Sequence, residues 1–175
     1  MKIFKLILAS SLSVLLSCQK QESLQSYFVS HQESPGFVQL DLPVSTFLTD
    51  DLDLSDREKE AWNSVRRLNM LAFVVDDTLN SANTEYKTVE QILKSSEYEQ
   101  LLQMKSEEFR SSVFSKGSED KIDEMVLTLN QDGKRFLVAR LLGNNMTLRK
   151  AGIIANSLDR VNFNATAMSQ FEGFL

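Results

Sequence analysis

The chain is poor in the residues that carry most protein chemistry: its 175 residues include one cysteine, one histidine and two prolines. A single cysteine excludes an internal disulfide. A single histidine leaves little room for metal sites or for thiol–imidazole and Ser–His–Asp catalysis. The glycines stand apart from one another, so no glycine-rich phosphate cradle is present. A formal charge of −5 argues against a nucleic-acid-binding protein.

What the chain contains is an ordinary globular composition, with 42% hydrophobic and 25% charged residues. These proportions exclude wholesale disorder, a collagen repeat and a coiled coil. The length suits one domain that can bury a core without disulfides.

The N-terminus has the pattern of an export signal. Lys2 and Lys5 precede an apolar run of roughly ten residues, which fits a signal peptide and is too short to span a bilayer. The run ends in a small-residue–cysteine pattern that resembles the lipobox of bacterial lipoproteins: Leu15, Leu16, Ser17 and Cys18. Residues 1–17 are therefore predicted to be cleaved. The alternative is a plain signal peptide that happens to contain a cysteine.

Cleavage would make Cys18 the first residue, with a diacylglyceryl group on its sulfur and a palmitate-type acyl chain on its amine. Each buried methylene contributes about 0.8 kcal/mol, so two or three chains would anchor the protein to a membrane. Losing two lysines leaves 17 basic residues against 24 acidic ones, a mature charge of about −7. Gln19 is not the aspartate that retains some lipoproteins in the inner membrane. We therefore expect a cell-envelope location, at the outer membrane, facing the periplasm or the cell surface.

The remainder predicts an α+β fold, a mainly antiparallel sheet of about five strands with two to four helices packed on one face. Helical patterns run from Ser55 to about Asn69, from Thr84 to Lys105 with a weak point at Ser95 and Ser96, and from Thr147 to about Arg160. Strand patterns cover 37–42, 70–75, 109–114, 122–129 and 136–142. The residue types of Asn130–Gly133 predict a turn between the last two of these strands. Pro43 closes the first strand, which is expected at a sheet edge.

Residues 161–175 form a C-terminal segment with several aromatic residues. One interpretation is a frayed tail. The other is an apolar segment that docks on this domain or on a partner, with Phe171 and Phe174 as the contacts.

Catalytic and metal-binding patterns are absent from the sequence, so no catalytic residue, metal ligand or cofactor is predicted. His31 has no cysteine or carboxylate partner at ligand spacing. The acidic stretch at 51–56 begins like a calcium loop, but it has Asp56 where that loop needs glycine and Trp62 where it needs glutamate. Negative charge at the start of a helix explains the stretch better.

Four segments behind the lipobox, 66–73, 98–102, 121–127 and 136–144, together resemble DUF4252, a family of small uncharacterised lipoproteins of Bacteroidota-type bacteria. The resemblance implies that Leu24–His31 is a short first helix, with residues 18–23 as lipidated cysteine and tether and residues 24–160 as one domain. It supplies no catalytic or ligand residue. It also implies a link to envelope signalling, through genes that often lie near extracytoplasmic sigma factors.

Three functions follow as expectations. The first is a lipid-anchored, non-catalytic domain that binds another envelope protein or a peptide. The second is a carrier of a small apolar ligand, in a cavity lined by Phe73, Val75, Leu127 and Leu137. The third is a hydrolase with paired carboxylates, which requires a polar pocket holding two acids with raised pKa values.

Overall fold

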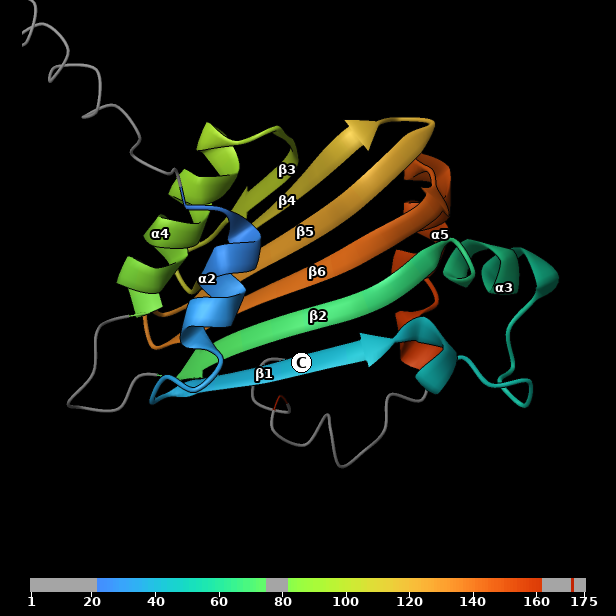
Figure 1. Cartoon of the computed structure of the whole chain (residues 1–175), viewed down its shortest axis with the longest axis horizontal. Coiled ribbons are helices and arrows are strands. Elements are labelled where there is room, and N and C mark those ends of the chain that lie inside the picture. The colour runs from blue at the N-terminus through green and yellow to red at the C-terminus, as the bar shows by residue number, and fades with distance from the viewer. Residues whose placement is uncertain (1–21, 75–81, 162–170, 172–175) are drawn as a thin grey trace, which may run out of the picture.

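A computed structural model describes residues 22–74, 82–161 and 171 of the chain (Figure 1). Four α-helices lie in this part: α2 (Leu24–His31), α3 (Asp56–Trp62), α4 (Ala82–Ser95) and α5 (Leu148–Ala155). The strands are β1 (Phe37–Pro43), β2 (Val65–Val74), β3 (Tyr98–Lys105), β4 (Phe109–Ser118), β5 (Lys121–Gln131) and β6 (Arg135–Met146). Two single 3-10 turns, η2 (Val44–Thr46) and η3 (Leu158–Arg160), complete the order.

The six strands form one sheet in the order β1-β2-β6-β5-β4-β3, and every neighbouring pair is antiparallel. The α+β class and the antiparallel sheet are therefore confirmed, with six strands in place of about five. β1 lies at one edge, as predicted from Pro43, and β3 lies at the other.

The additional strand comes from a region predicted as helix. The pattern from Thr84 to Lys105 is helical only as far as Ser95, and β3 follows it. The hydroxyls of Ser95 and Ser96 both donate to the carbonyl of Ile92, at 3.1 and 2.6 Å, and so satisfy the last turn of α4. The weak point in the sequence is thus the end of the helix.

The helix predicted from Ser55 to Asn69 is also shorter than expected. It starts as predicted, with the backbone N–H and hydroxyl of Ser55 donating to the Glu58 carboxylate at 2.8 and 2.7 Å, but α3 ends at Trp62. From Val65 onward the chain pairs with β6, and from Arg67 also with β1. The backbone hydrogen bonds of β2 to β1 and β6 stabilise the strand, and this tertiary pairing overrides the helical preference suggested by the spacing of the apolar residues.

The sheet has an apolar layer on each face, because alternate residues of a strand point to opposite sides. On β2, Leu68, Met70 and Ala72 join one layer, while Leu71 and Phe73 join the other. The helices also divide. Figure 1 shows α2 and α4 across one face, whereas α3 and α5 pack together at one end and contribute to the layer on the opposite face. The prediction of helices on one face was therefore wrong for α3 and α5.

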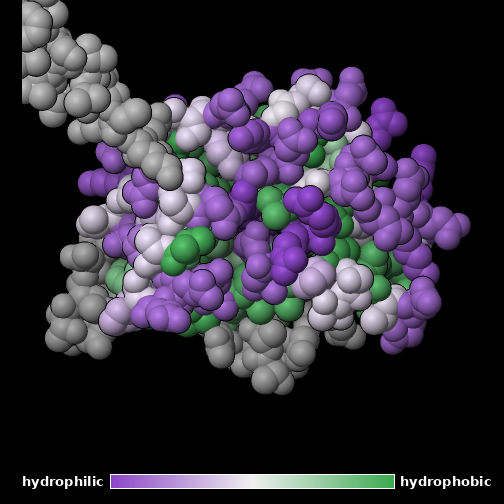
Figure 2. Space-filling model, viewed as in Figure 1, coloured by the Kyte–Doolittle hydropathy of each residue, from purple (hydrophilic) through white to green (hydrophobic). Residues whose placement is uncertain are grey.

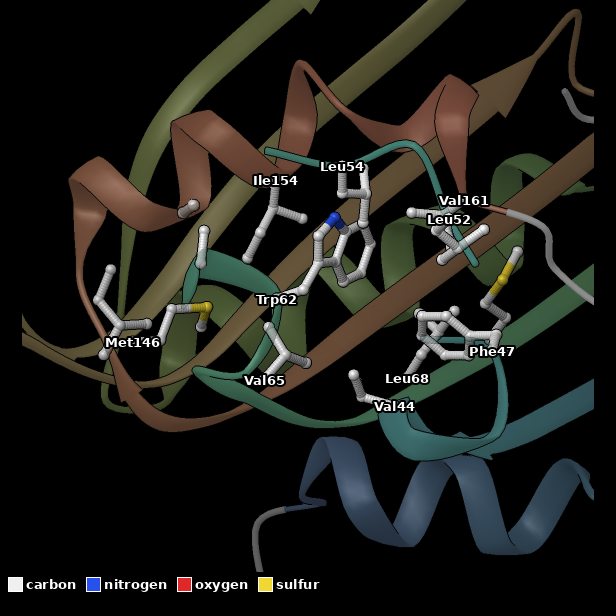
Figure 3. Packing of buried hydrophobic residues seen from close by; sticks show 14 of the residues in the cluster. Val44, Phe47, Leu52, Leu54, Trp62, Val65, Leu68, Met146, Ile154 and Val161 are labelled. Atoms are coloured by element: carbon white, nitrogen blue, oxygen red, sulfur yellow. The ribbon is translucent and has the colours of Figure 1, made fainter. Parts of the chain in front are cut away.

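The layer on the α3–α5 side, here called the Trp62 cluster, gathers side chains from distant parts of the chain (Figure 3). Its buried members are Val44, Phe47, Leu52, Leu54, Ala61, Trp62, Val65, Leu68, Met70, Ala72, Ile122, Leu137, Met146, Ala151, Ile154, Val161 and Phe171.

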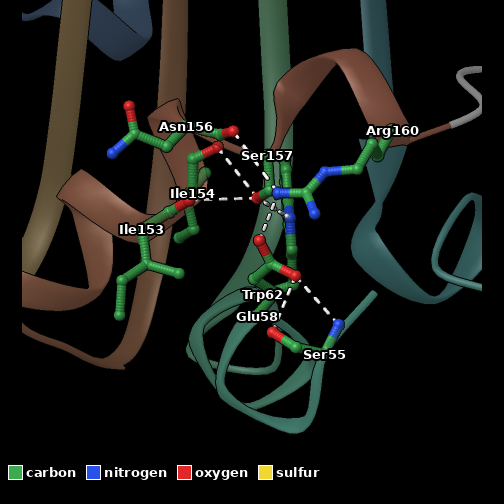
Figure 4. Close-up of polar contacts among 8 residues, drawn as sticks. All are labelled: Ser55, Glu58, Trp62, Ile153, Ile154, Asn156, Ser157 and Arg160. Carbon is green, nitrogen blue, oxygen red and sulfur yellow. Dashed lines mark hydrogen bonds and ion pairs between the residues drawn. The ribbon is translucent and has the colours of Figure 1, made fainter. Parts of the chain in front are cut away.

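Trp62 itself is fully buried, and its indole N–H donates to the hydroxyl of Ser157 at 3.0 Å (Figure 4). That hydroxyl lies 3.0 and 3.1 Å from the carbonyls of Ile153 and Ile154 at the end of α5, so Trp62 joins α3 to α5. Arg160 adds an ion pair with Glu58 on the surface of the same junction.

The layer on the α2–α4 side, here called the Phe136 cluster, joins these helices to the middle of the sheet. Its buried members are Leu24, Tyr27, Phe28, Leu71, Phe73, Ala82, Tyr86, Val89, Ile92, Leu93, Phe114, Val126, Phe136 and Val138. The helix Leu24–His31, which the family resemblance implied, is confirmed, and it belongs to the domain core.

The predicted turn between β5 and β6 is present, and it also holds the start of α4. Asp132 and Gly133 have φ values of 51° and 66°, the left-handed region that favours glycine. The Asn130 amide donates to Asn83 of α4 at 2.7 Å. A Cβ atom at Gly133 would lie 2.5 Å from the Asn83 amide nitrogen, so a larger residue there would displace the Asn83 side chain.

Candidate functional site

A buried ion pair lies on the α2–α4 face of the sheet. Arg140 of β6 is 7% exposed, and its Nη2 and Nε donate to the two carboxylate oxygens of Glu124 on β5 at 2.6 and 3.0 Å. Its Nη1 donates to the side-chain oxygen of Gln25 on α2 at 2.6 Å. The hydroxyl of Tyr98 on β3 also donates to Glu124. Side chains from α2, β3, β5 and β6 therefore meet around this ion pair.

The electrostatics keep Glu124 ionised. Burial opposes its charge, but hydrogen bonds from Arg140 and Tyr98 outweigh burial and lower its pKa below the ordinary value. Burial and the neighbouring carboxylate raise the pKa of Tyr98 above its ordinary value. A carboxylate that accepts three charge-assisted or phenolic hydrogen bonds is a structural link between strands and helix.

An open cleft of about 570 Å³ lies beside this pair, where α2 begins, α4 ends and β3 starts. Its charged lining is balanced, because Lys116 pairs with Glu97 at 3.0 Å and Arg140 pairs with Glu124. Lys116 also lies 5.9 Å from the centre of the Tyr98 ring. The charges of this lining cancel, and no side chain lining the cleft combines a free charge with burial of the kind that binds an ion.

The edge strand β3 is the most exposed strand of the sheet: its first residue is half-buried and the other seven are exposed. Leu102 and Met104 are 49% and 46% exposed, and they share one face. Across the sheet Leu102 is paired with Val113, which is paired with Leu127, itself 37% exposed. We call Leu102, Met104, Val113 and Leu127 the β3 patch. It lies on the sheet face opposite α2 and α4.

The face that carries α2 and α4 differs in character. Figure 2 shows hydrophilic side chains over most of that view, with hydrophobic atoms in separate small areas. The contiguous apolar row of the β3 patch is therefore a feature of the other side of the sheet.

The residues predicted as sites from the sequence are distributed as follows. The lipobox residues Leu15, Leu16, Ser17 and Cys18 lie outside the described residues, as does Phe174. Phe171 is fully buried in the Trp62 cluster. In this structure it contacts its own domain, the first of the two docking alternatives, and it is not presented to a partner.

The cavity imagined for an apolar carrier is not assembled by its predicted residues. Phe73 belongs to the Phe136 cluster and Leu137 to the Trp62 cluster, on opposite faces of the sheet. Leu127 is 37% exposed, and Val75 lies outside the described residues. Phe73 and Leu137 therefore do not line one cavity, because side chains on opposite faces of a sheet point away from each other.

The carboxyl groups with displaced pKa values are shifted in the direction opposite to that of a general acid. Asp51, Glu58, Glu90 and Glu124 all have pKa values below the ordinary range. Hydrogen bonds to Thr49 and Ser55 dominate at Asp51 and Glu58, whereas at Glu90 burial is outweighed by hydrogen bonds from Lys94, Tyr86 and Ser112. A general acid of a hydrolase needs the opposite shift.

His31 stacks between Tyr27 and Phe37, at ring-centre distances of 4.1 and 4.5 Å. Its Nδ1 lies 2.8 Å from the Tyr27 carbonyl oxygen. Within residues 22–74, 82–161 and 171, no group of three histidine, cysteine or acidic side chains could hold a metal ion. In the same residues, no helix is both long and apolar enough to cross a membrane.

The family model of DUF4252, a domain of unknown function, matches residues 27–167. The chain belongs to the DUF4252 family. The resemblance seen in the sequence is thereby confirmed for the domain. No curated protein and no solved structure matches the chain. Membership of DUF4252 supplies no activity and no functional residue.

The sequence pattern does not predict the β3 patch, since 98–105 fits the second half of a helical pattern. A signal for it exists: Leu102 and Met104 alternate with Gln103 and Lys105, which is the period of a strand with one apolar face. The Gln25–Arg140 contact has no such signal, because 115 positions separate the two residues.

Proposed function

We propose that this protein is a lipid-anchored component of the bacterial cell envelope whose domain binds another protein and catalyses no reaction. The single observation that carries the binding role is the open β3 edge with the β3 patch beside it. Exposed apolar rows on monomeric proteins mark interaction surfaces, and an unpaired strand edge accepts an added strand.

Anchoring is supported by the lipobox at Leu15–Cys18 and by the lack of another cysteine. α2 begins at Leu24, six residues after Cys18, so the extended tether reaches at most about 20 Å. Such a short tether would hold the domain close to the membrane. An outer-membrane location and a link to envelope signalling remain part of the proposal.

The anchor is tested by intact mass and membrane fractionation in a Gram-negative host. Wild type is expected in the membrane fraction with a diacyl or triacyl mass. Cys18→Ala is expected in the soluble fraction with no added mass. Soluble, unmodified wild type would contradict the anchor.

The binding role is tested by placing a photoreactive amino acid at Gln103 of β3 and, as a matched control, at Asp41, the exposed residue of the opposite edge strand. Irradiation of intact cells is expected to give one adduct from position 103, identified by mass spectrometry and mapped to an extended segment of the partner. Equal adducts from both positions, or none from position 103, would contradict binding at β3.

A further inference from the structure

The hydrogen-bonding groups on the outer side of β3 can be assigned from the β3–β4 hairpin. Ser106 N–H donates to the Phe109 carbonyl at 2.8 Å, so these two residues form a hydrogen-bonded pair. Pairs alternate in an antiparallel ladder, and Met104 with Ser111 is therefore the next hydrogen-bonded pair. Gln103 and Lys105 then direct their backbone N–H and C=O groups away from β4, toward the open edge.

The two faces of β3 indicate how apolar and polar residues would alternate in a strand added there. Residues opposite one another in a sheet share a face. An added residue opposite Leu102 or Met104 would therefore lie on the β3 patch and bury its apolar side chains. An added residue opposite Gln103 or Lys105 would lie on the polar side. The fitting partner alternates apolar and polar residues over a few positions.

The charges along this edge indicate which charge the ends of an added strand would carry. Residues 99–108 contain three glutamates, Glu99, Glu107 and Glu108, against the single Lys105, and all four are exposed. Glu97, just before β3, is paired with Lys116 of β4. The basic residues Arg110 and Lys116 belong to β4, one strand further in. An added strand would lie about 4.8 Å from β3 and twice that distance from β4, so it meets the acidic edge first.

The opposite edge lacks these properties. β1 contains one exposed residue, Asp41, which pairs with Arg67 of β2 at 2.5 Å, and it ends at Pro43, which has no N–H to donate. A second copy of this chain is also a poor occupant of the β3 edge, because antiparallel pairing would bring two acidic edges together.

From these observations we infer that the β3 edge binds an extended segment of a partner protein that alternates apolar and polar residues and carries lysine or arginine on its flanks. The inference rests on the proposed function, and it adds the chemistry of the partner. Main-chain hydrogen bonds to Gln103 and Lys105 supply affinity. The β3 patch and the flanking glutamates supply specificity.

The test measures binding of synthetic peptides to the full chain purified in detergent micelles, at low and at high salt. One peptide alternates valine and threonine between paired lysines, a second replaces the lysines by glutamates, and a third is the lysine peptide with a central proline. The lysine peptide is expected to bind about tenfold tighter than the glutamate peptide at low salt, and the ratio should narrow as salt screens the charges. The proline peptide should not bind.

Three variants place the binding on β3. Gln103→Pro removes one outward N–H and should abolish binding, whereas Gln39→Pro, at the equivalent outward position of β1, should leave it unchanged; circular dichroism checks that both fold. The combined change Glu99→Lys, Glu107→Lys and Glu108→Lys should reverse the preference toward the glutamate peptide, and it tests the charges even if Gln103→Pro fails to fold.

Equal binding of the lysine and glutamate peptides, or equal binding by the proline peptide, would overturn the inference. If the peptides fail in this way while the photoreactive residue at position 103 still maps to a partner, the partner chemistry is wrong and the proposed function stands. If the full chain dimerises and Gln103→Pro abolishes the dimer, the occupant of the β3 edge is a second copy of the chain. That result would also overturn the inference.

Discussion

The β2–β6 half of the sheet and its β3 edge differ in what covers them. β2 pairs on both sides, and its residues enter both apolar clusters, so eight of its ten residues are buried or half-buried between layers of side chains and helices. β3 pairs on one side, and its apolar side chains lie near half exposure. Burial concentrates folding free energy in the first region and leaves the second available for binding. Stability and binding should therefore respond to different substitutions.

The largest loss of stability is expected from Trp62→Ala, because Trp62 is fully buried between α3, α5 and the sheet. Removing a buried aromatic side chain costs about 3–5 kcal/mol. Denaturant unfolding of the Cys18→Ala chain measures the loss, with Leu102→Ala in the same background as the matched control. A loss at Leu102 as large as that at Trp62 would abolish the distinction between the two regions.

A smaller loss is expected from Glu124→Gln, which keeps an acceptor for Arg140 but removes the negative charge from a buried pair. Hydrogen bonds to charged groups contribute about 1.5–3 kcal/mol, so a loss near 2 kcal/mol is expected at neutral pH. Arg140→Met with Glu124→Leu, which removes both charges, should recover much of it. If the double variant is less stable than Glu124→Gln, the unpaired charge of Arg140 is not the cause of the lost stability in Glu124→Gln.

The same pair makes stability depend on pH. Because the pKa of Glu124 is lowered in the folded protein, the stabilisation is complete above the unfolded value, about 4.3 for glutamate, and is lost as pH falls below it toward the folded value. Wild type should therefore lose more free energy of unfolding between pH 6 and pH 3 than Glu124→Gln does. The other carboxylates with lowered pKa values are present in both proteins and cancel. Parallel pH profiles would show that Glu124 has the same pKa in the folded and unfolded chains.

The difference between the two regions also explains what could be predicted from the sequence. β2 and β6 carry long apolar runs, and the strands at 70–75 and 136–142 were found from them, although both are longer in the structure. The turn at Asn130–Gly133 was found from its residue types. β3 was missed, since two adjacent leucines, Leu101 and Leu102, fit a helical spacing, and a bulge between Gln100 and Leu102 interrupts the strand period. The division of helices between the faces depends on long-range contacts such as Trp62–Ser157, which no local pattern encodes.

An intermediate effect is expected where α3 meets α5. Ser157→Ala removes the hydroxyl that accepts the Trp62 indole N–H at 3.0 Å, and a net hydrogen bond contributes about 1 kcal/mol. A double-mutant cycle with Trp62→Phe isolates this contact from the loss of packing. Strictly additive losses in the cycle would show that the indole N–H and the Ser157 hydroxyl are not coupled.

The smallest effect on stability is expected from the double change Leu102→Ser and Met104→Ser in the β3 patch. Both side chains are about half exposed, and surface substitutions usually change the free energy of unfolding by no more than about 0.5 kcal/mol. Serine removes apolar contact area without removing the backbone groups of the edge, so binding of the lysine-flanked peptide should weaken while the unfolding midpoint stays near that of wild type. Because Leu127 and Val113 remain in the patch, the binding loss should be partial, and adding Leu127→Ser should deepen it. If the double change instead unfolds the domain, the patch belongs to the core, and the β3 edge is as much a part of the folding unit as β2.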